Sequence, residues 1–345
     1  MIGFRVDANE KIATGHLMRC ISIATELLES GIPCIFFLAE EKETARLKAA
    51  GIPYEILHSD WNHPESELPQ LLPLLKHYPL KWLIVDSYQV TNTYLSKLDH
   101  ELPVLYIDDI EQEIYPVTAI LHYGLRPDPE AYLHRYAHTA TKILEGTKYT
   151  PLRREFQSFS EPVSRQKSIL LTTGGTDPFH ISLQLLSACL NENPSNPLIR
   201  SLLTDFSFDV IIGSLNRDDI PLQTLASHYP QIRLHKNVNN MNYYMRRSTL
   251  AISAGGTTLS ELCACSTPTI CFSFADNQME GTLEMGRRKI MLYAGDARQD
   301  PVIDNILHSI YLFLSDKSLY EEYAGRMNTY VDGLGVKRIA DFLLQ

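Results

Sequence analysis

The sequence predicts an α/β protein with two domains, each built on a parallel sheet that helices cover. Short apolar runs rich in β-branched and aromatic residues alternate with amphipathic, helix-like stretches from one end of the chain to the other. This alternation is typical of parallel sheets. The chain of 345 residues is also longer than one hydrophobic core usually organises. Its 44% apolar and 21% charged residues are ordinary for a globular protein.

The first half of the chain, residues 1–155, is expected to form one domain. Its predicted strands are residues 3–6, 33–39, 54–57, 82–86, 104–107 and 119–122. A helix is predicted over residues 16–30, where Leu17, Ile21, Ala24 and Leu28 recur at helical spacing.

The second domain is expected over residues 156–330. The segment 150–167 is polar, contains two prolines and lacks periodicity, which indicates a linker. The predicted strands that follow are residues 168–172, 209–212, 232–234, 250–253 and 269–274. Open parallel sheets bind ligands beyond the carboxyl ends of their strands, so a cleft between two facing sheets is the expected binding place.

Composition excludes several classes of partner. A formal net charge of -10 and the absence of a Lys/Arg run argue against a nucleic-acid surface. No apolar run approaches the roughly 20 residues of a membrane span, and the N-terminus lacks the features of a signal peptide. The six cysteines show no paired C-x-x-C spacing, so we expect them reduced and structural. We expect a cytoplasmic monomer that binds neither nucleic acid nor membrane.

Two segments of the second half share one pattern, in which a strand is followed by a glycine pair and a helix start. They are Gly174-Gly175-Thr176-Asp177 and Gly255-Gly256-Thr257-Thr258. Paired glycines let a ligand approach the backbone, and the free N–H groups of a helix start favour an anion such as a diphosphate. The repetition favours phosphate binding for at least one of them.

Local capping explains the same residues in a second way. Asp177 before Pro178 is a usual N-cap and first-turn pair, so for the first segment a turn and a phosphate site are equally supported. Thr258-x-x-Glu261 has the spacing of a capping box. On spacing alone, a capping role for Glu261 is favoured over a contact with a ribose. In the segment Asp276-Asn277-Gln278, side-chain amides reach the expected cleft, although Asp276 or Asn277 could equally be an N-cap.

His16 is the candidate catalytic residue of the first half. Gly15-His16 opens the first long helix, directly after the loop that follows the first strand. A histidine there could take a proton from water near neutral pH, and Arg19 follows on the same helix face. Position alone makes a solvated helix-start histidine equally probable. Asp86-Ser87-Tyr88 and Asp108-Asp109 also end strands, with a turn or cap role favoured for Asp109.

Other metal-like or catalytic signals are weak. The segment 58–65, HSDWNHPE, contains suitable residue types for a metal but lacks the spacing of a known site, so a polar loop is the favoured interpretation. No Ser-His-Asp signature, Walker loop or G-x-G-x-x-G stands out. We expect neither a cofactor nor a metal.

Taken together, the motifs resemble the PseG-type UDP-sugar hydrolases of pseudaminic acid biosynthesis. The motifs are Arg5-x-Asp7, Gly15-His16-x-x-Arg19, Asp86-x-Tyr88, Asp108-Asp109, Leu152-Arg153-x-Glu155-Phe156, Gly174-Gly175-Thr176-Asp177, Asn277-Gln278 and Asp332-Gly333-x-Gly335-x-x-Arg338-Ile339. The last of these looks like the family's C-terminal helix, here 331–345. The second half also resembles the nucleotide-binding half of MurG-like glycosyltransferases. The resemblance implies a GT-B fold of two Rossmann-like domains.

The resemblance also implies a reaction. It is the hydrolysis of UDP-2,4-diacetamido-2,4,6-trideoxy-β-L-altropyranose to UDP and free sugar, with inversion and without a metal. His16 would activate the water and Tyr88 would match the family's active-site tyrosine. Glu261 would hold the ribose, and backbone groups of Val238 to Met241 would contact the uracil. The diphosphate would lie on Gly255, Gly256, Thr257 and Thr258. The other motif residues expected to line the substrate site are Arg5, Asp7, Gly15, Arg19, Gly174, Gly175, Thr176, Asn277 and Gln278.

Two departures from the family pattern lie on the sugar side. Leu121-His122-Tyr123-Gly124 stands where the family usually has an asparagine-bearing segment, and Ser87-Tyr88-Gln89 replaces the commoner His-Tyr-Gly. They concern the identity of the sugar and not that of the nucleotide. Two other functions are considered: a GT-B glycosyltransferase with a UDP-sugar donor, and a nucleotide-sugar binding module without chemistry, in which His16 has no role.

Overall fold

The computed structural model divides the chain into two compact units. Unit 1 comprises Met1–Arg154 with Gly333–Gln345, and unit 2 comprises Glu155–Asp332. The structure describes all residues except 10, 13, 158, 160–162 and 191–202. The expected α/β fold of two Rossmann-like domains with parallel sheets is confirmed, because every strand pair in both sheets is parallel.

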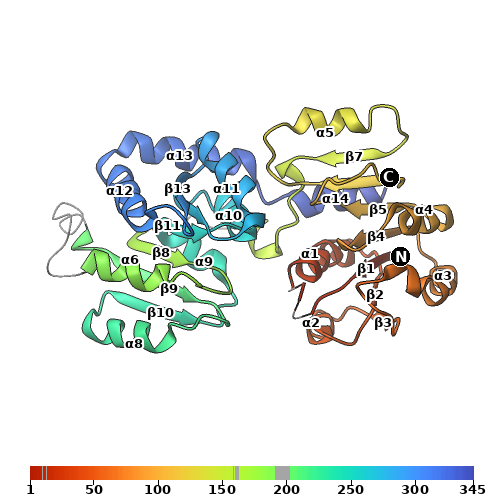
Figure 1. Ribbon diagram of the computed structural model, residues 1–345, viewed down its shortest axis with the longest axis horizontal. Coiled ribbons are helices and arrows are strands. Elements are labelled where there is room, and N and C mark those ends of the chain that lie inside the picture. Colours follow the sequence, from red (N-terminus) through yellow and green to blue (C-terminus); the bar gives the residue numbers. More distant parts are fainter. Residues whose placement is uncertain (10, 13, 158, 160–162, 191–202) are drawn as a thin grey trace. The chain divides into compact units, whose positions relative to one another are not determined.

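Unit 1 contains a sheet in the order β3-β2-β1-β4-β5-β6-β7 (Figure 1). Its strands are β1 (Ile2–Val6), β2 (Cys34–Leu38), β3 (Tyr54–Ile56), β4 (Trp82–Asp86), β5 (Val104–Ile107), β6 (Ala119–His122) and β7 (Lys142–Glu145). Its helices are α1 (Gly15–Glu29), α2 (Thr44–Ala49), α3 (Leu68–His77), α4 (Asn92–Glu101), α5 (Pro129–Arg135) and α14 (Gly335–Leu343), with short 3-10 turns at Pro64–Glu67 and Thr147–Tyr149.

The core of unit 1 has a layer on each face of its sheet. Helices α1 and α14 cover one face, where Leu17 and Ile339 pack on Phe4 and Phe36. Helices α3 and α4 cover the other face. Strands buried on both sides become continuous apolar runs, which is why most of them were predictable from sequence.

Unit 2 repeats this plan with a sheet in the order β10-β9-β8-β11-β12-β13. Its strands are β8 (Gln166–Thr172), β9 (Ser207–Ile212), β10 (Ile232–Lys236), β11 (Ser248–Ala254), β12 (Thr269–Ser273) and β13 (Leu292–Asp296). Its helices are α6 (Ile181–Leu190), α8 (Asp219–His228), α9 (Met241–Arg247), α10 (Thr257–Ala264), α11 (Asp276–Arg287), α12 (Val302–Ser315) and α13 (Lys317–Tyr330), and a 3-10 turn spans Arg154–Phe156.

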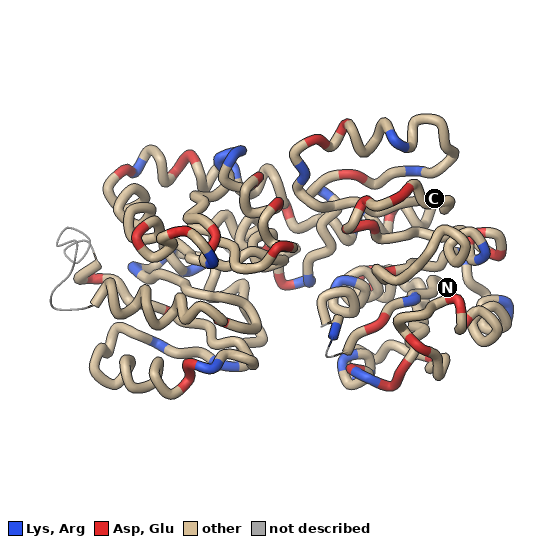
Figure 2. Tube along the Cα trace, viewed as in Figure 1, with Lys and Arg blue, Asp and Glu red and all other residues tan. Residues whose placement is uncertain are grey.

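The strand order reverses once in each sheet, between β1 and β4 in unit 1 and between β8 and β11 in unit 2. At such a switch point the loops that leave the two strands turn to opposite faces and open a crevice at the carboxyl end. Lys/Arg and Asp/Glu are interspersed over both units (Figure 2). Of the helices in the described ranges, none has the length and apolar character needed to cross a bilayer.

Sequence patterns missed two strands, both at sheet edges. These are β7 (Lys142–Glu145) and β13 (Leu292–Asp296). Lys142 is exposed, and β13 is interrupted by Gly295, so neither forms the apolar run expected of a buried strand. The predicted linker 150–167 is shorter than expected, because β8 already begins at Gln166.

Helix α14 is fixed to the body of unit 1 by a close backbone contact, and this predicts the effect of a single methyl group. A Cβ on Gly335 would lie 2.1 Å from the carbonyl oxygen of Thr150, whereas a Cβ on Gly325 in α13 would have no atom within 4 Å. We expect Gly335→Ala to lower the free energy of unfolding by about 1–3 kcal/mol through overpacking. Gly325→Ala, the control, should be neutral or stabilising. Urea denaturation measures both, and equal stability of the two variants would contradict the prediction.

Candidate active site

The switch point of unit 1 brings His16 and Asp86 together. His16 lies in the first turn of α1, and Asp86 is the last residue of β4, whose register pairs it with Val6 of β1. His16 Nδ1 lies 2.5 Å from Asp86 Oδ1. Because a carboxylate only accepts hydrogen bonds, Nδ1 carries the proton and the lone pair of neutral His16 is on Nε2. Among the described residues, none forms a hydrogen bond with Nε2.

Arg19 holds the Asp86 carboxylate from the side. Its Nε donates to Asp86 Oδ2 at 2.6 Å and its Nη2 to Oδ1 at 2.5 Å, a bidentate pair. The Asp86 side chain is fully buried. Burial alone would raise the pKa of Asp86, but the charge of Arg19 and the contact with His16 outweigh it and hold this pKa below its ordinary value. Asp86 therefore stays ionised at neutral pH.

Tyr88 and Asp109 complete the arrangement around His16. The Tyr88 ring meets the His16 ring edge-on, with centroids 4.5 Å apart at 78°. Its hydroxyl donates to Asp109 Oδ2 at 3.1 Å, and the same oxygen accepts from Arg19 Nη1 at 2.5 Å. Partial burial and the neighbouring Asp109 raise the pKa of Tyr88, which is still 43% exposed, so its hydroxyl stays protonated at neutral pH. The sequence-based preference for a turn role at Asp109 missed this bridge, which only the pairing of strands reveals.

Arg5 and Asp7 belong to a separate, buried network. Arg5 Nε and Nη2 donate to the two oxygens of Glu67 at 2.5 and 2.6 Å, and Arg5 Nη1 donates to Asp7 at 2.6 Å. Tyr94 and Ser59 donate to Glu67 as well. Arg5 is 2% exposed. This geometry favours a structural role for Arg5 and Asp7 over the direct substrate contact expected from sequence.

The first glycine pair of unit 2 is packed against the neighbouring strand. Gly174 has a φ of +80°, which favours glycine, and a Cβ on Gly213 would lie 2.2 Å from the Gly174 carbonyl oxygen. Asp177 accepts hydrogen bonds from the backbone N–H groups of Ile181 and Ser182, both at 2.9 Å. A side-chain carboxylate thus already occupies the start of α6, but the expected N-cap and first-turn pair Asp177-Pro178 is wrong, because α6 begins only at Ile181. Thr176 lies between these two features.

The second glycine pair leaves a helix start without a side-chain cap. Gly256 is the N-cap of α10, with a φ of +136°, and no side-chain cap hydrogen bond is present among the residues that the structure describes. A Cβ on Gly255 would lie 2.8 Å from both Gln278 and Thr282, so α11 packs directly on this loop. The capping box expected at Thr258-x-x-Glu261 is wrong, because Thr258 is inside the helix and not at its N-cap. Glu261 is 8% exposed.

The remaining predicted residues of unit 2 follow β10 and β12, which are separated by three strands in the sheet. Val238 follows β10 and Met241 begins α9. Asn277 is exposed in the first turn of α11, where Gln278 accepts a hydrogen bond from Phe274 N at 3.0 Å. The expected N-cap role of Asp276 or Asn277 is wrong, since the N-cap is Ala275. Gly15, in unit 1, is the exposed first residue of α1.

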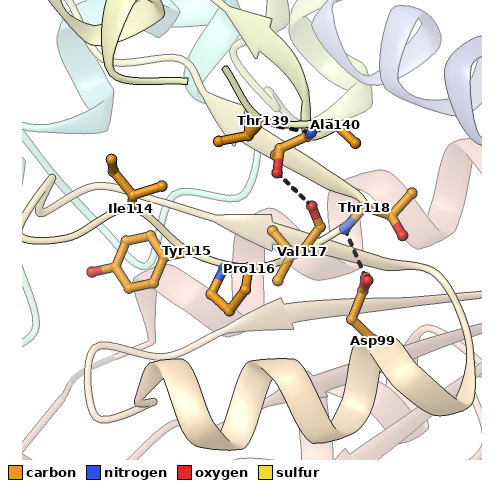
Figure 3. Close-up of a pocket in the computed structure, with 9 residues that line it drawn as sticks. Asp99, Ile114, Tyr115, Pro116, Val117, Thr118, Thr139 and Ala140 are labelled. Atoms are coloured by element: carbon orange, nitrogen blue, oxygen red, sulfur yellow. Dashed lines mark hydrogen bonds between the residues drawn. The ribbon is translucent and has the colours of Figure 1, made fainter. Parts of the chain in front are cut away.

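A cavity lies outside this site. This cavity of about 470 Å³ opens among residues that precede β6 and β7, at the amino ends of these strands and not at the carboxyl ends (Figure 3). Its carboxylate, Asp99, already accepts the backbone N–H groups of Val104 and Thr118. No group of three or more His, Cys, Asp or Glu side chains that could hold a metal ion is found within the described part of the chain.

Comparisons with known proteins find distant relatives. No protein-family model matches the chain. An uncharacterized protein of Methanocaldococcus jannaschii is 23% identical over 271 residues, which are 75% of this chain and 53%, about half, of that protein. The spore coat polysaccharide biosynthesis protein SpsG of Bacillus subtilis is 22% identical over 99% of this chain and 97% of its own. The UDP-2,4-diacetamido-2,4,6-trideoxy-β-L-altropyranose hydrolase of Campylobacter jejuni is 24% identical over 75% of this chain and 86% of its own.

Solved structures share the fold at lower identity. MurG of Acinetobacter baumannii has a TM-score of 0.69 at 12% identity, covering 99% of both chains. The UDP-GlcNAc 2-epimerase of Neisseria meningitidis, bound to UDP-GlcNAc, has a TM-score of 0.67 at 16% identity and covers 100% of both. The chain therefore has the GT-B fold.

The buried ion pair of the site predicts a pH-dependent stability. Asp86→Asn should lower the free energy of unfolding by about 3 kcal/mol at neutral pH, because Arg19 loses its counter-charge. The folded-state pKa of Asp86 is lowered, so its contribution is fully present above the unfolded value of about 4 and is lost as pH falls below it. The difference between wild type and variant should shrink over that range.

The measurement is urea denaturation from pH 7 to pH 3, with Asp304→Asn as an exposed control that should change little. A difference between wild type and Asp86→Asn that stays constant down to pH 3 would contradict the assignment.

Proposed function

We propose that the protein hydrolyses a UDP-linked 2,4-diacetamido-2,4,6-trideoxyhexose to UDP and the free sugar. The observation that carries this is the geometry of His16, whose ring is held by Asp86 at 2.5 Å while Nε2 has no partner among the described residues. A histidine oriented in this way is a general base for a small nucleophile. The name of the Campylobacter relative supplies the sugar.

The reaction needs one proton transfer in unit 1. Nε2 of His16 takes a proton from water as the water oxygen bonds to the anomeric carbon. The bond from that carbon to the phosphate oxygen breaks, and UDP leaves with its electron pair, which inverts the anomeric configuration. The ionised Asp86 stabilises the imidazolium that forms, and Arg19 keeps Asp86 ionised and fixed in orientation.

Unit 2 would bind the leaving group. The uncapped first turn of α10 offers backbone N–H groups, and the positive end of its helix dipole favours a diphosphate. Of the two glycine pairs, Gly255-Gly256 is the better phosphate site, because Asp177 already occupies the start of α6. The buried Glu261 lies one turn further along α10 and would accept the ribose hydroxyls.

A glycosyltransferase is the second candidate, favoured by the fold shared with MurG. Both reactions would use the same UDP site, but a transferase requires an acceptor in place of water. Release of UDP without any acceptor therefore separates them.

The test is to incubate the purified protein with a panel of UDP-sugars and follow the freed sugar by proton NMR. We expect release of UDP and a sugar of inverted anomeric configuration. His16→Ala should abolish turnover while UDP binding by calorimetry stays within roughly 1.4 kcal/mol of wild type. Retained turnover in this variant would overturn the mechanism. Turnover that depends on an added sugar acceptor would favour the transferase.

Glu261 gives a separate test of the nucleotide site. Glu261→Ala should weaken UDP binding about tenfold or more, since it removes a buried charged acceptor. Glu321→Ala, on the exposed surface of α13, is a control for the loss of one negative charge and should bind UDP like wild type. If UDP binding by Glu261→Ala equals that of the control, Glu261 has no part in nucleotide recognition.

A further inference from the structure

The Asp109 carboxylate has one oxygen in use and one free. Oδ2 accepts from Arg19 Nη1 at 2.5 Å and from the Tyr88 hydroxyl at 3.1 Å. Oδ1 forms no hydrogen bond with any residue that the structure describes. The side chain is 22% exposed, so this oxygen is available to a molecule from solution. Through the other oxygen, Oδ2, the carboxylate is bonded to Tyr88, whose ring lies against His16.

The loop that carries Asp109 is fixed in advance. The buried Asp108 accepts the backbone N–H groups of Ile110 and Glu111 through Oδ1, at 3.1 and 2.9 Å, and the Tyr132 hydroxyl through Oδ2, at 2.7 Å. Arg126 Nη2 donates to the Asp109 carbonyl oxygen at 2.6 Å. A group held in this way loses little conformational entropy when it binds a ligand.

Gly124 lies close to the Arg126 guanidinium. Its missing side chain leaves room for Arg126, whose Nε would lie 3.2 Å from a Cβ at that position. Arg126 also pairs with Glu111 at 2.6 Å, and Glu111 accepts from the buried His122 at 2.9 Å. The segment in which this chain departs from the PseG-type pattern, 121–124, is thus the support of the Asp109 loop.

We propose that Asp109 determines sugar specificity by accepting, through Oδ1, a hydrogen bond from an N–H or O–H donor of the sugar ring. The proposal rests on the function proposed above, in which the sugar reacts beside His16. An acetamido N–H and a ring hydroxyl are both donors, and a carboxylate oxygen that only accepts discriminates against a sugar that lacks the donor. The other oxygen keeps Tyr88 and Arg19 in place.

Asp109→Asn is a sharp variant because the amide has one acceptor and one donor end. Arg19 and the Tyr88 hydroxyl are both donors, so the amide oxygen must face them and the amide nitrogen takes the place of Oδ1. The variant thus keeps both protein contacts and presents a donor to the sugar. Tyr88→Phe is the matched control, since it removes the contact with Oδ2 and leaves Oδ1 unchanged.

The experiment measures kcat/KM for the UDP-linked diacetamido sugar and for three analogues, in which the 2-acetamido or 4-acetamido group is replaced by acetoxy or the 3-hydroxyl is removed. We expect Asp109→Asn to lower kcat/KM for the parent sugar about tenfold or more, with UDP affinity by calorimetry unchanged. For the analogue that lacks the donor bound by Oδ1, kcat/KM should differ little between wild type and variant. Which analogue it is distinguishes an N–H from an O–H donor.

An equal loss on the parent sugar and all three analogues would overturn the proposal and leave Asp109 with a positioning role. The same conclusion follows if Asp109→Asn adds no loss to Tyr88→Phe. Failure of the proposed function has a different signature, because wild type would then release no UDP from the parent sugar.

Discussion

The charge on one buried carboxylate, Asp86, organises the site of unit 1. Its two oxygens accept from His16, twice from Arg19 and from the Cys20 thiol. A buried carboxylate is costly unless it is paired and hydrogen-bonded, and the bidentate Arg19 provides both. The orientation of His16 follows, because its Nδ1 has a fixed acceptor. The position of Asp109 depends on the same guanidinium, so removal of the Asp86 charge would disturb every contact around His16.

Strand order explains why these residues meet, although 70 positions separate His16 from Asp86. The switch between β1 and β4 puts the loop after β1 next to the last residue of β4. Unit 2 uses the same device between β8 and β11, where the two glycine pairs follow adjacent strands. One topological rule thus accounts for both the histidine site and the glycine-rich site.

Sequence patterns predicted what depends on local composition. Buried strands such as β4 have continuous apolar runs, and α1 has clear helical periodicity, so both were found. The edge strand β7 was missed because its apolar run is only Ile143 and Leu144, with Lys142 and Glu145 at its ends. His16 was identified by position and resemblance, but its bond to Asp86 depends on strand register. The same is true of Asp109, for which a local turn role was favoured. The spacing at Thr258 was also misleading, because the N-cap of α10 is Gly256, which has no side chain that could cap the helix.

The two arginine networks of unit 1 show what distinguishes a structural ion cluster from a functional one. Around Arg5, both oxygens of Glu67 are each shared by two donors, and both oxygens of Asp7 accept from Arg5 or the backbone N–H of Ala39. In this buried network every carboxylate oxygen already accepts at least one hydrogen bond from the protein, which suits a structural role.

Around Arg19, by contrast, His16 Nε2 and Asp109 Oδ1 remain without partners among the described residues. The Arg19 guanidinium holds both groups: it positions His16 through Asp86, and it bonds the other oxygen of Asp109 directly. Completed bonds fix the geometry, and the atoms without partners are those to which the proposed function assigns water and sugar. By this criterion the contacts of Arg5-x-Asp7 favour a structural role, while the proposed chemistry depends on Gly15-His16-x-x-Arg19.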